Sequence, residues 1–471
     1  MRVGVLGCGT VGGAFVALLE RDAGHIAART GIDFEVTRVA VRNLSAPRTV
    51  RPADGVLTRD TEALVVADDV DVVVEVIGGI EPARRLVVAA LRAGKPVVTA
   101  NKELVANVGE ELFDAARAAG VDLLFEAAVA AGIPLVGVLA RTLAGERVNR
   151  VMGIVNGTTN FILTKMTDDG AAYADALAEA QRLGYAEADP TADVEGFDAG
   201  AKAAILAMTA FGAKVVAGDV YQEGIAGVRP ADIEAARRMG HVIKLLAVAE
   251  RVRTPPADDA AADDAAADGA DIGEVTVRVH PTMVPADHPL AAVRDSFNAV
   301  FLQGEAVGDL MLYGRGAGGF PTASAVLGDV IAAAVNLRKG VSFDLGPLTP
   351  VRLRPIDETS SAFHVSIAVT DEPGVLAAVA GVFGAHDVSI RSMEQTAAPE
   401  GRDDDPAGGT GEAAGSGHAA PAAAGAGAGA TAHLEFITHR AREADVQATL
   451  RDLRELAQVR SVGTPIRVIG E

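Results

Sequence analysis

The sequence predicts a doubly wound α/β domain followed by two α+β domains, and three observations support this prediction. The chain has 471 residues, more than the ~250–300 at which a single core stops growing, so several domains are expected. Short apolar runs alternate with helical runs as far as about residue 134, which is typical of a parallel sheet covered by helices. The last segment, residues 358–471, has the β-α-β-β-α-β order of a small ferredoxin-like domain.

The composition is typical of a folded, water-soluble protein, because 49% of the residues are apolar and 22% are charged. The formal charge of −21 disfavours binding to nucleic acid or to an anionic membrane. No apolar run of ~20 residues lacks charges or turn-forming residues, so no membrane span is expected. Residues 1–4 lead directly into a strand-like run, and we therefore expect no signal peptide and a cytoplasmic location.

Two segments differ in composition from the rest of the chain. Residues 254–271 hold six Asp and no basic residue, and residues 397–430 are almost wholly Ala, Gly, Pro and acidic residues. Such composition predicts flexible, solvated insertions. They carry charges of −6 and −4, so −10 of the −21 belongs to them. The predicted domains are 1–134, completed by about 305–345, then 135–304 and 358–471.

The middle of the chain is predicted to be mainly helical at first and then rich in strands. Ala-rich amphipathic runs predict helices over residues 171–182, 200–211 and 232–249. Strands are expected at 275–280 and 299–304, and a further helix at 322–337. One cysteine and nine scattered histidines indicate neither a disulfide nor a zinc site.

The segment GCGTVG at residues 7–12 lies between the first expected strand and the first expected helix. In this context Gly7 turns the chain, Gly9 lets a pyrophosphate approach the backbone, and Gly12 lets helix and strand pack closely. A Rossmann-type dinucleotide site is therefore predicted, the alternative being a turn that merely needs glycines. The predicted cofactor contacts in this loop are Gly7, Gly9, Thr10, Val11 and Gly12.

The end of the second expected strand bears on the choice of cofactor. Enzymes that prefer NAD usually have a carboxylate there, which holds the ribose 2′-hydroxyl group. This chain has none, and Arg42 could instead pair with a 2′-phosphate. NADP is therefore favoured, with NAD possible and a solvated loop arginine as the alternative interpretation of Arg42.

Four segments together resemble homoserine dehydrogenase. They are ANKEL at 100–104, EAAVAAGIP at 126–134, GIVNGTTN at 153–160, and AQRLGYAEADPTADVEGFDAGAK at 180–202, the most specific of the four. The resemblance spans roughly residues 1–340. It implies NAD(P)-dependent interconversion of L-homoserine and L-aspartate 4-semialdehyde, a step toward threonine, isoleucine and methionine, and it makes the middle domain the catalytic and dimerisation domain.

The resemblance also assigns the residues of the site. Lys202 matches the family's proton donor to the developing alkoxide, and Lys102 is the alternative proton carrier. Glu187 and Asp198 match positions that hold the amino acid, with Asp193 in support. Asp198 and Lys202 are spaced i and i+4, so they share a helix face, although such pairs ordinarily decorate solvated helices.

Further family positions are implied for the cofactor and for a cation. Besides Lys102, residues Gly78, Gly184 and Gly318 match cofactor positions, and Gly318 lies in a glycine-dense run before a helix. A monovalent cation, sodium above all, is implied at four positions, where a glutamate that merely caps a helix is the alternative. These positions are Glu126 and the carbonyl groups of Val129, Ala131 and Ile133.

The C-terminal segment separately resembles an ACT domain, in which the turn DEPG at 371–374 would line an effector pocket. L-Threonine is the effector that the resemblance implies, and the insertion at 397–430 is a departure from a compact ACT domain. A homo-oligomer, dimer or tetramer, is also implied. Two other interpretations stay open: a nucleotide sensor without turnover, and a dehydrogenase acting on another amino or hydroxy acid.

Overall fold

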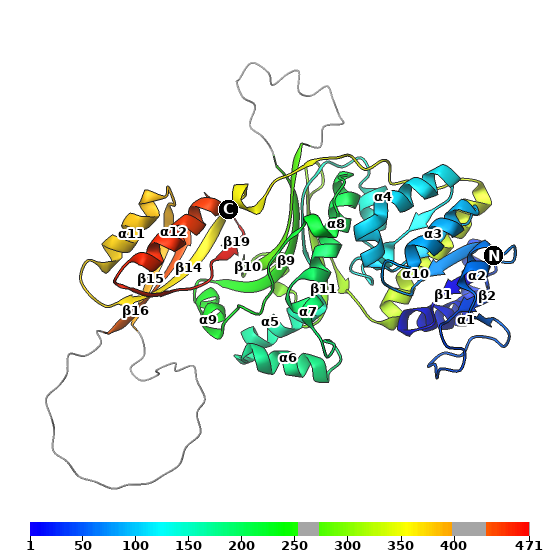
Figure 1. Ribbon diagram of the computed structural model, residues 1–471, viewed down its shortest axis with the longest axis horizontal. Helices are drawn as coiled ribbons and strands as arrows, with labels where there is room; N and C mark the ends of the chain where they lie inside the picture. Colours follow the sequence, from blue (N-terminus) through cyan, green and yellow to red (C-terminus); the bar gives the residue numbers. More distant parts are fainter. Residues whose placement is uncertain (253–272, 398–429, 471) are drawn as a thin grey trace, which may run out of the picture. The chain divides into compact units, whose positions relative to one another are not determined.

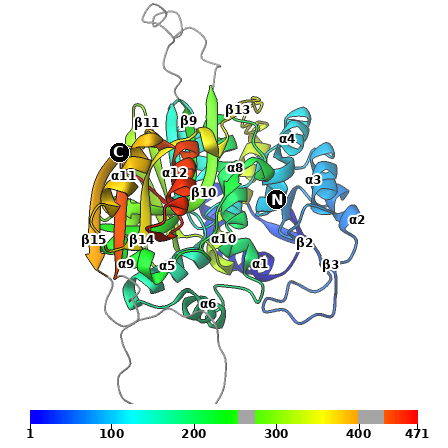
Figure 2. The same ribbon diagram turned by 60° about the vertical axis from the view of Figure 1, so that its left-hand side comes forward.

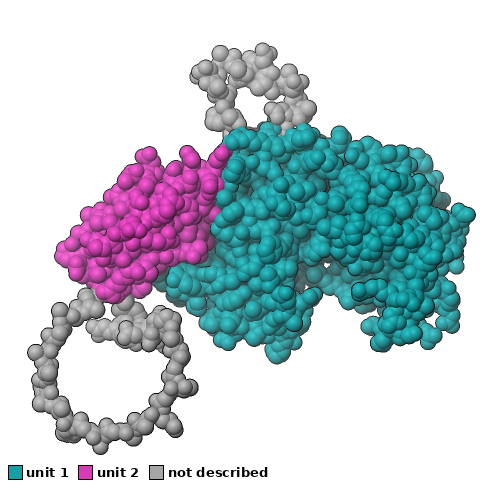
Figure 3. All heavy atoms as spheres, in the orientation of Figure 1, with its two compact units in different colours: residues 1–356 teal, residues 357–471 magenta. Residues whose placement is uncertain are grey.

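The structure, a computed structural model, describes residues 1–252, 273–397 and 430–470. The chain forms two compact units, residues 1–356 and residues 357–471, coloured teal and magenta in Figure 3. The predicted insertion 254–271 lies outside the described residues, as does 397–430 apart from its first and last residue.

A six-stranded parallel sheet begins the first unit. Its strands are β1 (Arg2–Leu6), β2 (Glu35–Ala40), β3 (Leu57–Thr58), β4 (Val72–Glu75), β5 (Val97–Thr99) and β6 (Leu123–Leu124). The spatial order β3-β2-β1-β4-β5-β6 is that of a doubly wound Rossmann sheet, so the predicted fold of this region is confirmed. The carboxyl ends of all six strands meet at one edge, which is where such sheets bind their ligands.

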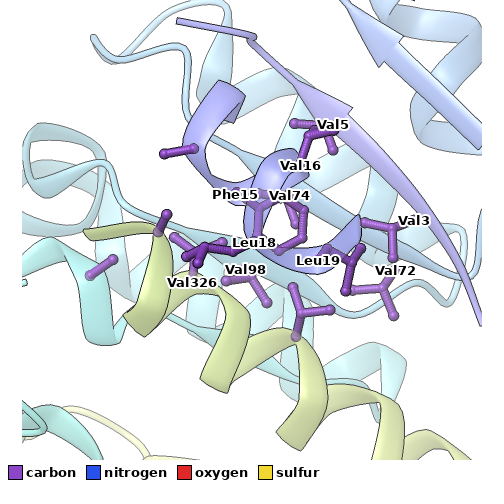
Figure 4. Close-up of a cluster of buried hydrophobic side chains, with 14 of the residues drawn as sticks. Val3, Val5, Phe15, Val16, Leu18, Leu19, Val72, Val74, Val98 and Val326 are labelled. Atoms are coloured by element: carbon purple, nitrogen blue, oxygen red, sulfur yellow. The ribbon is translucent and has the colours of Figure 1, made fainter. Parts of the chain in front are cut away.

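Five helices cover this sheet. They are α1 (Thr10–Thr30), α2 (Thr61–Val66), α3 (Ala83–Arg92), α4 (Lys102–Ala119) and α10 (Gly319–Lys339). The core lies between β1, β4, α1 and α10, where Phe15, Leu19, Val5 and Val74 are buried together with Val326 (Figure 4). Packing against α10 brings residues from far along the chain into the nucleotide-binding region.

By length and composition, α10 could cross a membrane, and among the described ranges it alone passes that test. Its apolar face is instead part of the core just described, with Ala323, Val330 and Ala333 fully buried. A core helix of a folded domain has the same length and hydropathy as a membrane span, which explains the match.

An antiparallel sheet forms the middle of the first unit. Its strands are β7 (Val148–Ile154), β9 (His241–Val252), β10 (Glu274–Pro285), β11 (Phe297–Gly304) and β12 (Gly308–Arg315). They lie in the order β12-β11-β7-β9-β10, with two short strands, β8 (Tyr221–Gln222) and β13 (Arg352–Leu353), parallel to β10. Of the segment 305–345, β12 therefore belongs to this sheet and α10 to the Rossmann core.

The helices of this region are α5 (Gly157–Asp169), α6 (Tyr173–Arg182), α7 (Thr191–Val194), α8 (Phe197–Phe211) and α9 (Pro230–Arg238). The helix predicted over 232–249 is wrong in its second half, because α9 ends at Arg238 and β9 begins at His241. Gly240, at φ +71°, breaks the helix. From there β9 pairs with β10 along its whole length, and this pairing overrides the helical propensity of the alanines.

The second unit is a small α+β domain, as predicted. It contains β14 (Ser360–Thr370), α11 (Val375–Ala385), β15 (Ile390–Ala397), β16 (Thr431–Thr438), α12 (Glu443–Glu455), β18 (Val459–Val462) and β19 (Ile466–Val468). β14 pairs with β16 on one side and with β18 and β19 on the other, and β16 pairs with β15. The two helices lie side by side over the sheet (Figures 1 and 2). This is the ferredoxin-like arrangement.

Candidate active site

The glycine loop joins β1 to α1 and is tightly packed on one side. Gly7 has φ +103°, and a Cβ there would lie 2.9 Å from the carbonyl oxygen of Val76. A Cβ on Gly12 would lie 2.2 Å from the carbonyl oxygen of Gly7, whereas one on Gly9 would meet nothing within 4 Å. The space at Gly9, in front of the first amide groups of α1, is therefore suited to a pyrophosphate.

The start of α10 lies against the start of α1. A Cβ on Gly319 would lie 3.2 Å from the Thr10 side chain and 3.3 Å from its carbonyl oxygen. Thr10 and Val11 are the first two residues of α1, and Gly318, at φ +117°, precedes the first residue of α10. Since Gly318 also lines the cavity described below, the glycine loop and that cavity adjoin.

Two of the arginines between β2 and β3, Arg42 and Arg48, differ in placement. Arg42 is exposed and makes no hydrogen bond or ion pair within the described ranges. Arg48, which the sequence did not single out, donates hydrogen bonds to the carbonyl groups of Leu44 (3.0 Å) and Ala46 (2.9 Å). Burial raises the pKa of the Cys8 thiol, and the nearby Arg48 guanidinium opposes that rise. Arg48 therefore lies near Cys8 of the glycine loop.

A cavity of about 1200 Å³ lies between the Rossmann sheet and the helices of the middle region. Several predicted site residues form its wall, and these are Lys102, Gly184, Glu187, Asp193, Asp198, Lys202 and Gly318. The glycine loop, Arg42 and Gly78 do not line it. Gly78, at φ +75°, belongs instead to the turn after β4, which packs against Gly7.

Asp198 is the centre of the charged cluster in this cavity. It lies in the first turn of α8, is 7% exposed, and accepts a hydrogen bond from the Nζ of Lys202, one turn later, at 2.7 Å. The Nζ of Lys102, the first residue of α4, lies 2.7 Å from the other carboxylate oxygen. Lys202 also donates to the carbonyl oxygen of Val155 at 2.7 Å. One buried carboxylate therefore holds two ammonium groups from different helices.

The electrostatics keep this carboxylate ionised. Burial by itself would raise the pKa of Asp198, but the charges of Lys202 and Lys102 outweigh burial and hold the pKa far below its usual range. For Lys102, burial lowers the pKa, and the attraction of Asp198 reverses this, so its pKa is raised overall. The three groups together carry a net charge of +1, which suits an oxygen on which negative charge develops.

Asn156, which the sequence did not single out, links the carboxylate of Asp198 to that of Asp193. It caps α5 through a hydrogen bond from the Thr159 amide (2.9 Å), and its Nδ2 donates to both Asp193 (2.7 Å) and Asp198 (2.8 Å). Thr158 completes the set by donating to Asp193 at 3.0 Å. An Asn between a strand and a helix could have indicated the cap, but not the contacts with Asp193 and Asp198.

Glu187 differs from the two aspartates. It is exposed, it lines the cavity, and its carboxylate makes no hydrogen bond or ion pair in the part of the chain that the structure describes. Gly184, at φ +78°, ends the turn after α6 and lies in the same wall. Glu187 therefore offers a carboxylate that is available to a ligand, whereas Asp193 is already hydrogen-bonded.

The segment with the predicted cation ligands lies beside Asp329, whose Oδ2 accepts a hydrogen bond from the backbone amide of Glu126 at 2.9 Å. The carboxylate of Glu126 accepts three backbone amides, those of Leu135 (2.5 Å), Val136 (2.7 Å) and Gly137 (2.7 Å). The carbonyl groups of Val129, Ala131 and Ile133 accept no hydrogen bond within the described ranges. No cluster of three or more His, Cys, Asp or Glu residues occurs there either. Any cation in this segment would therefore depend on carbonyl oxygens.

Comparison with known proteins supports one family. Residues 134–331 match the family described as homoserine dehydrogenase, residues 7–126 match the NAD binding domain of homoserine dehydrogenase, and residues 364–408 match the ACT domain. The chain is 48% identical to the homoserine dehydrogenase of Corynebacterium glutamicum over 468 residues, covering 99% of this chain and 95% of that protein. The chain belongs to the homoserine dehydrogenase family.

Further members of the homoserine dehydrogenase family agree in sequence and fold. The Mycobacterium tuberculosis protein is 45% identical over 472 residues, covering 99% of this chain and 97% of its own length. A crystal structure of a homoserine dehydrogenase from Thiobacillus denitrificans has a TM-score of 0.84 at 37% identity and covers 100% of this chain and 98% of its own. The predictions of an oxidoreductase with an NAD(P)-binding domain and a C-terminal ACT domain are confirmed.

Proposed function

We propose that the protein interconverts L-homoserine and L-aspartate 4-semialdehyde, with NADP as the cofactor and with the cavity around Asp198 as the active site. The observation that carries this proposal is the Lys102–Asp198–Lys202 cluster, joined by contacts of 2.7 Å in a cavity that adjoins the glycine loop. A nucleotide sensor without turnover would have no need of ammonium groups held in this way.

The bound nicotinamide would supply or accept the hydride, and the protein must place the substrate carbon and move one proton at the substrate oxygen. We assign that proton to Lys202. An ammonium group has three donors, and two of those on Lys202 are used by Asp198 and Val155. The third is available to the substrate oxygen, and the fixed partners limit how far the group can turn.

Lys102 is the alternative proton carrier, and its geometry favours a supporting role. Its side chain is 40% exposed, compared with 12% for Lys202, and among the described residues it forms an ion pair with Asp198 alone. Its charge would stabilise the alkoxide and orient the substrate, since a fixed cation near a developing oxyanion lowers the barrier.

The amino-acid end of the substrate needs an anion for its ammonium group. Glu187 suits this role because it lines the cavity and its carboxylate has no partner among the described residues. Asp193 would have a supporting role, because it accepts hydrogen bonds from Asn156 and Thr158 and so holds these two side chains in place in the cavity wall. The ammonium group of homoserine would then lie away from the two lysines, and the reacting carbon would lie near them.

Substitution of the two lysines tests the assignment. Lys202→Ala should lower kcat by about 10²–10⁴-fold, the range of general acid catalysis, while NADPH affinity measured by fluorescence titration stays near that of the parent chain. Lys102→Ala should lower kcat less and raise the KM for homoserine. A Lys202→Ala enzyme with the parent kcat would refute the role of Lys202.

The preference for NADP rests on the absence of a carboxylate at the end of β2 and on two nearby arginines, Arg42 and Arg48. A hyperthermophilic archaeal homoserine dehydrogenase with NADPH bound is 29% identical to this chain, covers 71% of this chain and 97% of its own, and has a TM-score of 0.58. The ratio of kcat/KM for NADPH and NADH is the direct test of this preference.

A monovalent cation, sodium in the first instance, would be held by the carbonyl oxygens of Val129, Ala131 and Ile133 together with Glu126. These carbonyl groups have no hydrogen-bond partner among the described residues, and the donor set is all oxygen, which fits a hard cation. Glu126 would contribute chiefly charge, because its oxygens already accept three amides. The test is to measure activity in sodium buffer and in tetramethylammonium buffer, and we expect the activity to be higher in sodium.

The ACT domain would bind L-threonine and inhibit the enzyme. Support comes from the turn at 371–374, which joins β14 to α11 as it does in the family's effector pocket. We further propose a homo-oligomer, dimer or tetramer, that acts in the cytoplasm. Analytical ultracentrifugation with and without threonine would measure both the oligomeric state and its response to the effector.

A further inference from the structure

The carboxyl ends of β4 and β5 are joined by a buried polar network, which we define as Glu75, Thr99 and Asn101. Glu75 is the last residue of β4, Thr99 is the last residue of β5, and the two are paired in the sheet. Glu75 and Thr99 are fully buried, and Asn101 is 6% exposed. None of the three residues lines the cavity, so the roles assigned above do not include them.

Every group that reaches the Glu75 carboxylate in this network is a hydrogen-bond donor. Oε1 accepts the backbone amides of Ile77 (2.8 Å) and Gly78 (3.3 Å), and Oε2 accepts the Thr99 hydroxyl at 2.6 Å. Burial raises the pKa of Glu75, and these donors oppose the rise. The Glu75 carboxylate therefore links the turn after β4, through Oε1, to the end of β5, through Oε2.

The second half of the network leads to the first turn of α4. The Thr99 hydroxyl accepts a hydrogen bond from the backbone amide of Asn101 (3.0 Å). The side-chain Nδ2 of Asn101 donates to the carbonyl oxygen of Gly79, in the turn after β4 (2.6 Å). The Asn101 Oδ1 caps α4 by accepting the Leu104 amide at 3.1 Å. The hydrogen bonds therefore form a ring from the β4 turn through Glu75, Thr99 and Asn101 back to the same turn. Lys102 is the next residue after Asn101 and the first residue of the capped helix.

Two parts of the site meet at this network. On one side, the turn after β4 packs against Gly7 of the glycine loop, where a Cβ would lie 2.9 Å from the Val76 carbonyl oxygen. On the other side, the backbone of Lys102 is set by the cap, and its Nζ reaches Asp198. A shift of the β4 turn is therefore transmitted through Glu75 and Thr99 to the lysine that faces the substrate.

We propose that Glu75 is a positioning residue for hydride transfer, acting through Thr99 and Asn101 to set Lys102 relative to the cofactor loop. This inference rests on the proposed dehydrogenase activity. Glu75 itself touches neither cofactor nor substrate in this account, and its effect is geometric. Misplacement by about 1 Å of a group in such a site can lower kcat by up to about 10²-fold.

The test changes the hydrogen bonds of the network one residue at a time; the Thr99 hydroxyl makes two of them, with Glu75 and with the backbone amide of Asn101. Thr99→Val removes the hydroxyl and keeps the shape, whereas Thr99→Ser restores the hydroxyl. Glu75→Gln keeps one acceptor oxygen for the β4 turn and presents an NH₂ group to Thr99, whose hydroxyl must then accept where it now donates. Thr209→Val is the matched control, because Thr209 is a buried threonine near the end of α8 whose hydroxyl donates only to its own helix, at the Ile205 carbonyl oxygen.

We expect Thr99→Val and Glu75→Gln each to lose about 10–10²-fold in kcat for aspartate semialdehyde reduction, with Thr99→Ser recovering most of it. Since both changes alter the same Glu75–Thr99 contact, the double variant should lose no more than the worse single variant, within about twofold. The control should keep the parent kcat. Titration with NADPH counts the folded sites, so kcat per site is independent of any loss of stability.

The outcomes separate the two proposals. An active parent chain whose Thr99→Val variant keeps the parent kcat overturns the positioning role alone. Equal losses in Thr99→Val and Thr99→Ser overturn it as well, because the hydroxyl would then not matter. A parent chain that does not reduce aspartate semialdehyde refutes the proposed function, and the positioning role is refuted with it.

Discussion

Replacing Asp198 by asparagine tests the central contact of the site, because the change removes one charge and almost no volume. Asp198 is 7% exposed and now accepts three donors: the ammonium groups of Lys102 and Lys202, each at 2.7 Å, and the amide of Asn156 at 2.8 Å. Asparagine offers one acceptor oxygen and a competing NH₂ group. One lysine must then lose its partner, and the net charge of the cluster rises from +1 to +2.

The expected magnitude follows from the burial of each partner. Breaking a buried ion pair by removing one member destabilises a protein by about 3–5 kcal/mol. Lys102 is 40% exposed and can turn into water, whereas Lys202 is 12% exposed and cannot. We therefore expect a loss near the lower limit, about 3 kcal/mol in the free energy of unfolding, and a fall in kcat of about 10²-fold as Lys102 leaves the cavity.

Urea unfolding followed by circular dichroism measures the first quantity, and NADPH absorbance measures the second. Asp232→Asn is the control, because Asp232 is a buried carboxylate whose ion-pair partner, Arg229, is 53% exposed and can rehydrate. It should lose less stability and keep the parent kcat. A change below about 1 kcal/mol in Asp198→Asn, together with an unchanged kcat, would show that the two lysines do not depend on this carboxylate.

Three further predictions concern cofactor, effector and pH. Arg42→Ala and Arg48→Ala should each lower kcat/KM with NADPH and leave the value with NADH unchanged, because NADH lacks the 2′-phosphate with which a guanidinium group pairs. Threonine should inhibit the full chain and have no effect on a chain ending at Ile356, the last residue of the first unit. Burial lowers the pKa of Lys244 to about 8 from its usual 10.5, so the folded state binds that proton less tightly than the unfolded state does. Stability should therefore rise by about 2 kcal/mol between pH 7 and pH 9.5, and urea unfolding of Lys244→Met should lack this increment relative to the parent chain.

Most of the fold could be predicted because local patterns carry it. The alternation of strands and helices, the glycines at 7–12 and the β-α-β-β-α-β pattern of residues 358–471 can each be followed along consecutive stretches of sequence, without knowledge of distant contacts. The error at 232–249 arose where local propensity and tertiary pairing disagree. An Ala-rich run with helical spacing became β9 because β10, more than twenty residues away, pairs with it throughout.

The site was predictable in its members but not in its connections. The resemblance supplied Lys102, Asp198 and Lys202, yet the spacing of Asp198 and Lys202 alone describes an ordinary surface pair. What makes the pair unusual is its burial and its contact with Lys102 from another helix, which only the packing of α4 on α8 creates. Asn156 and Glu75 went unnoticed for the same reason, because their partners are distant in sequence.

Lys102 is consequently held at both ends by different parts of the first unit. Its backbone is fixed by the strand-end network of Glu75, Thr99 and Asn101, which belongs to the Rossmann sheet, and its ammonium group is fixed by Asp198 from the middle region. A loss at either end frees the same side chain. The effects of Thr99→Val and Asp198→Asn on kcat should therefore be less than additive, and fully additive losses would mean that the two act on different steps.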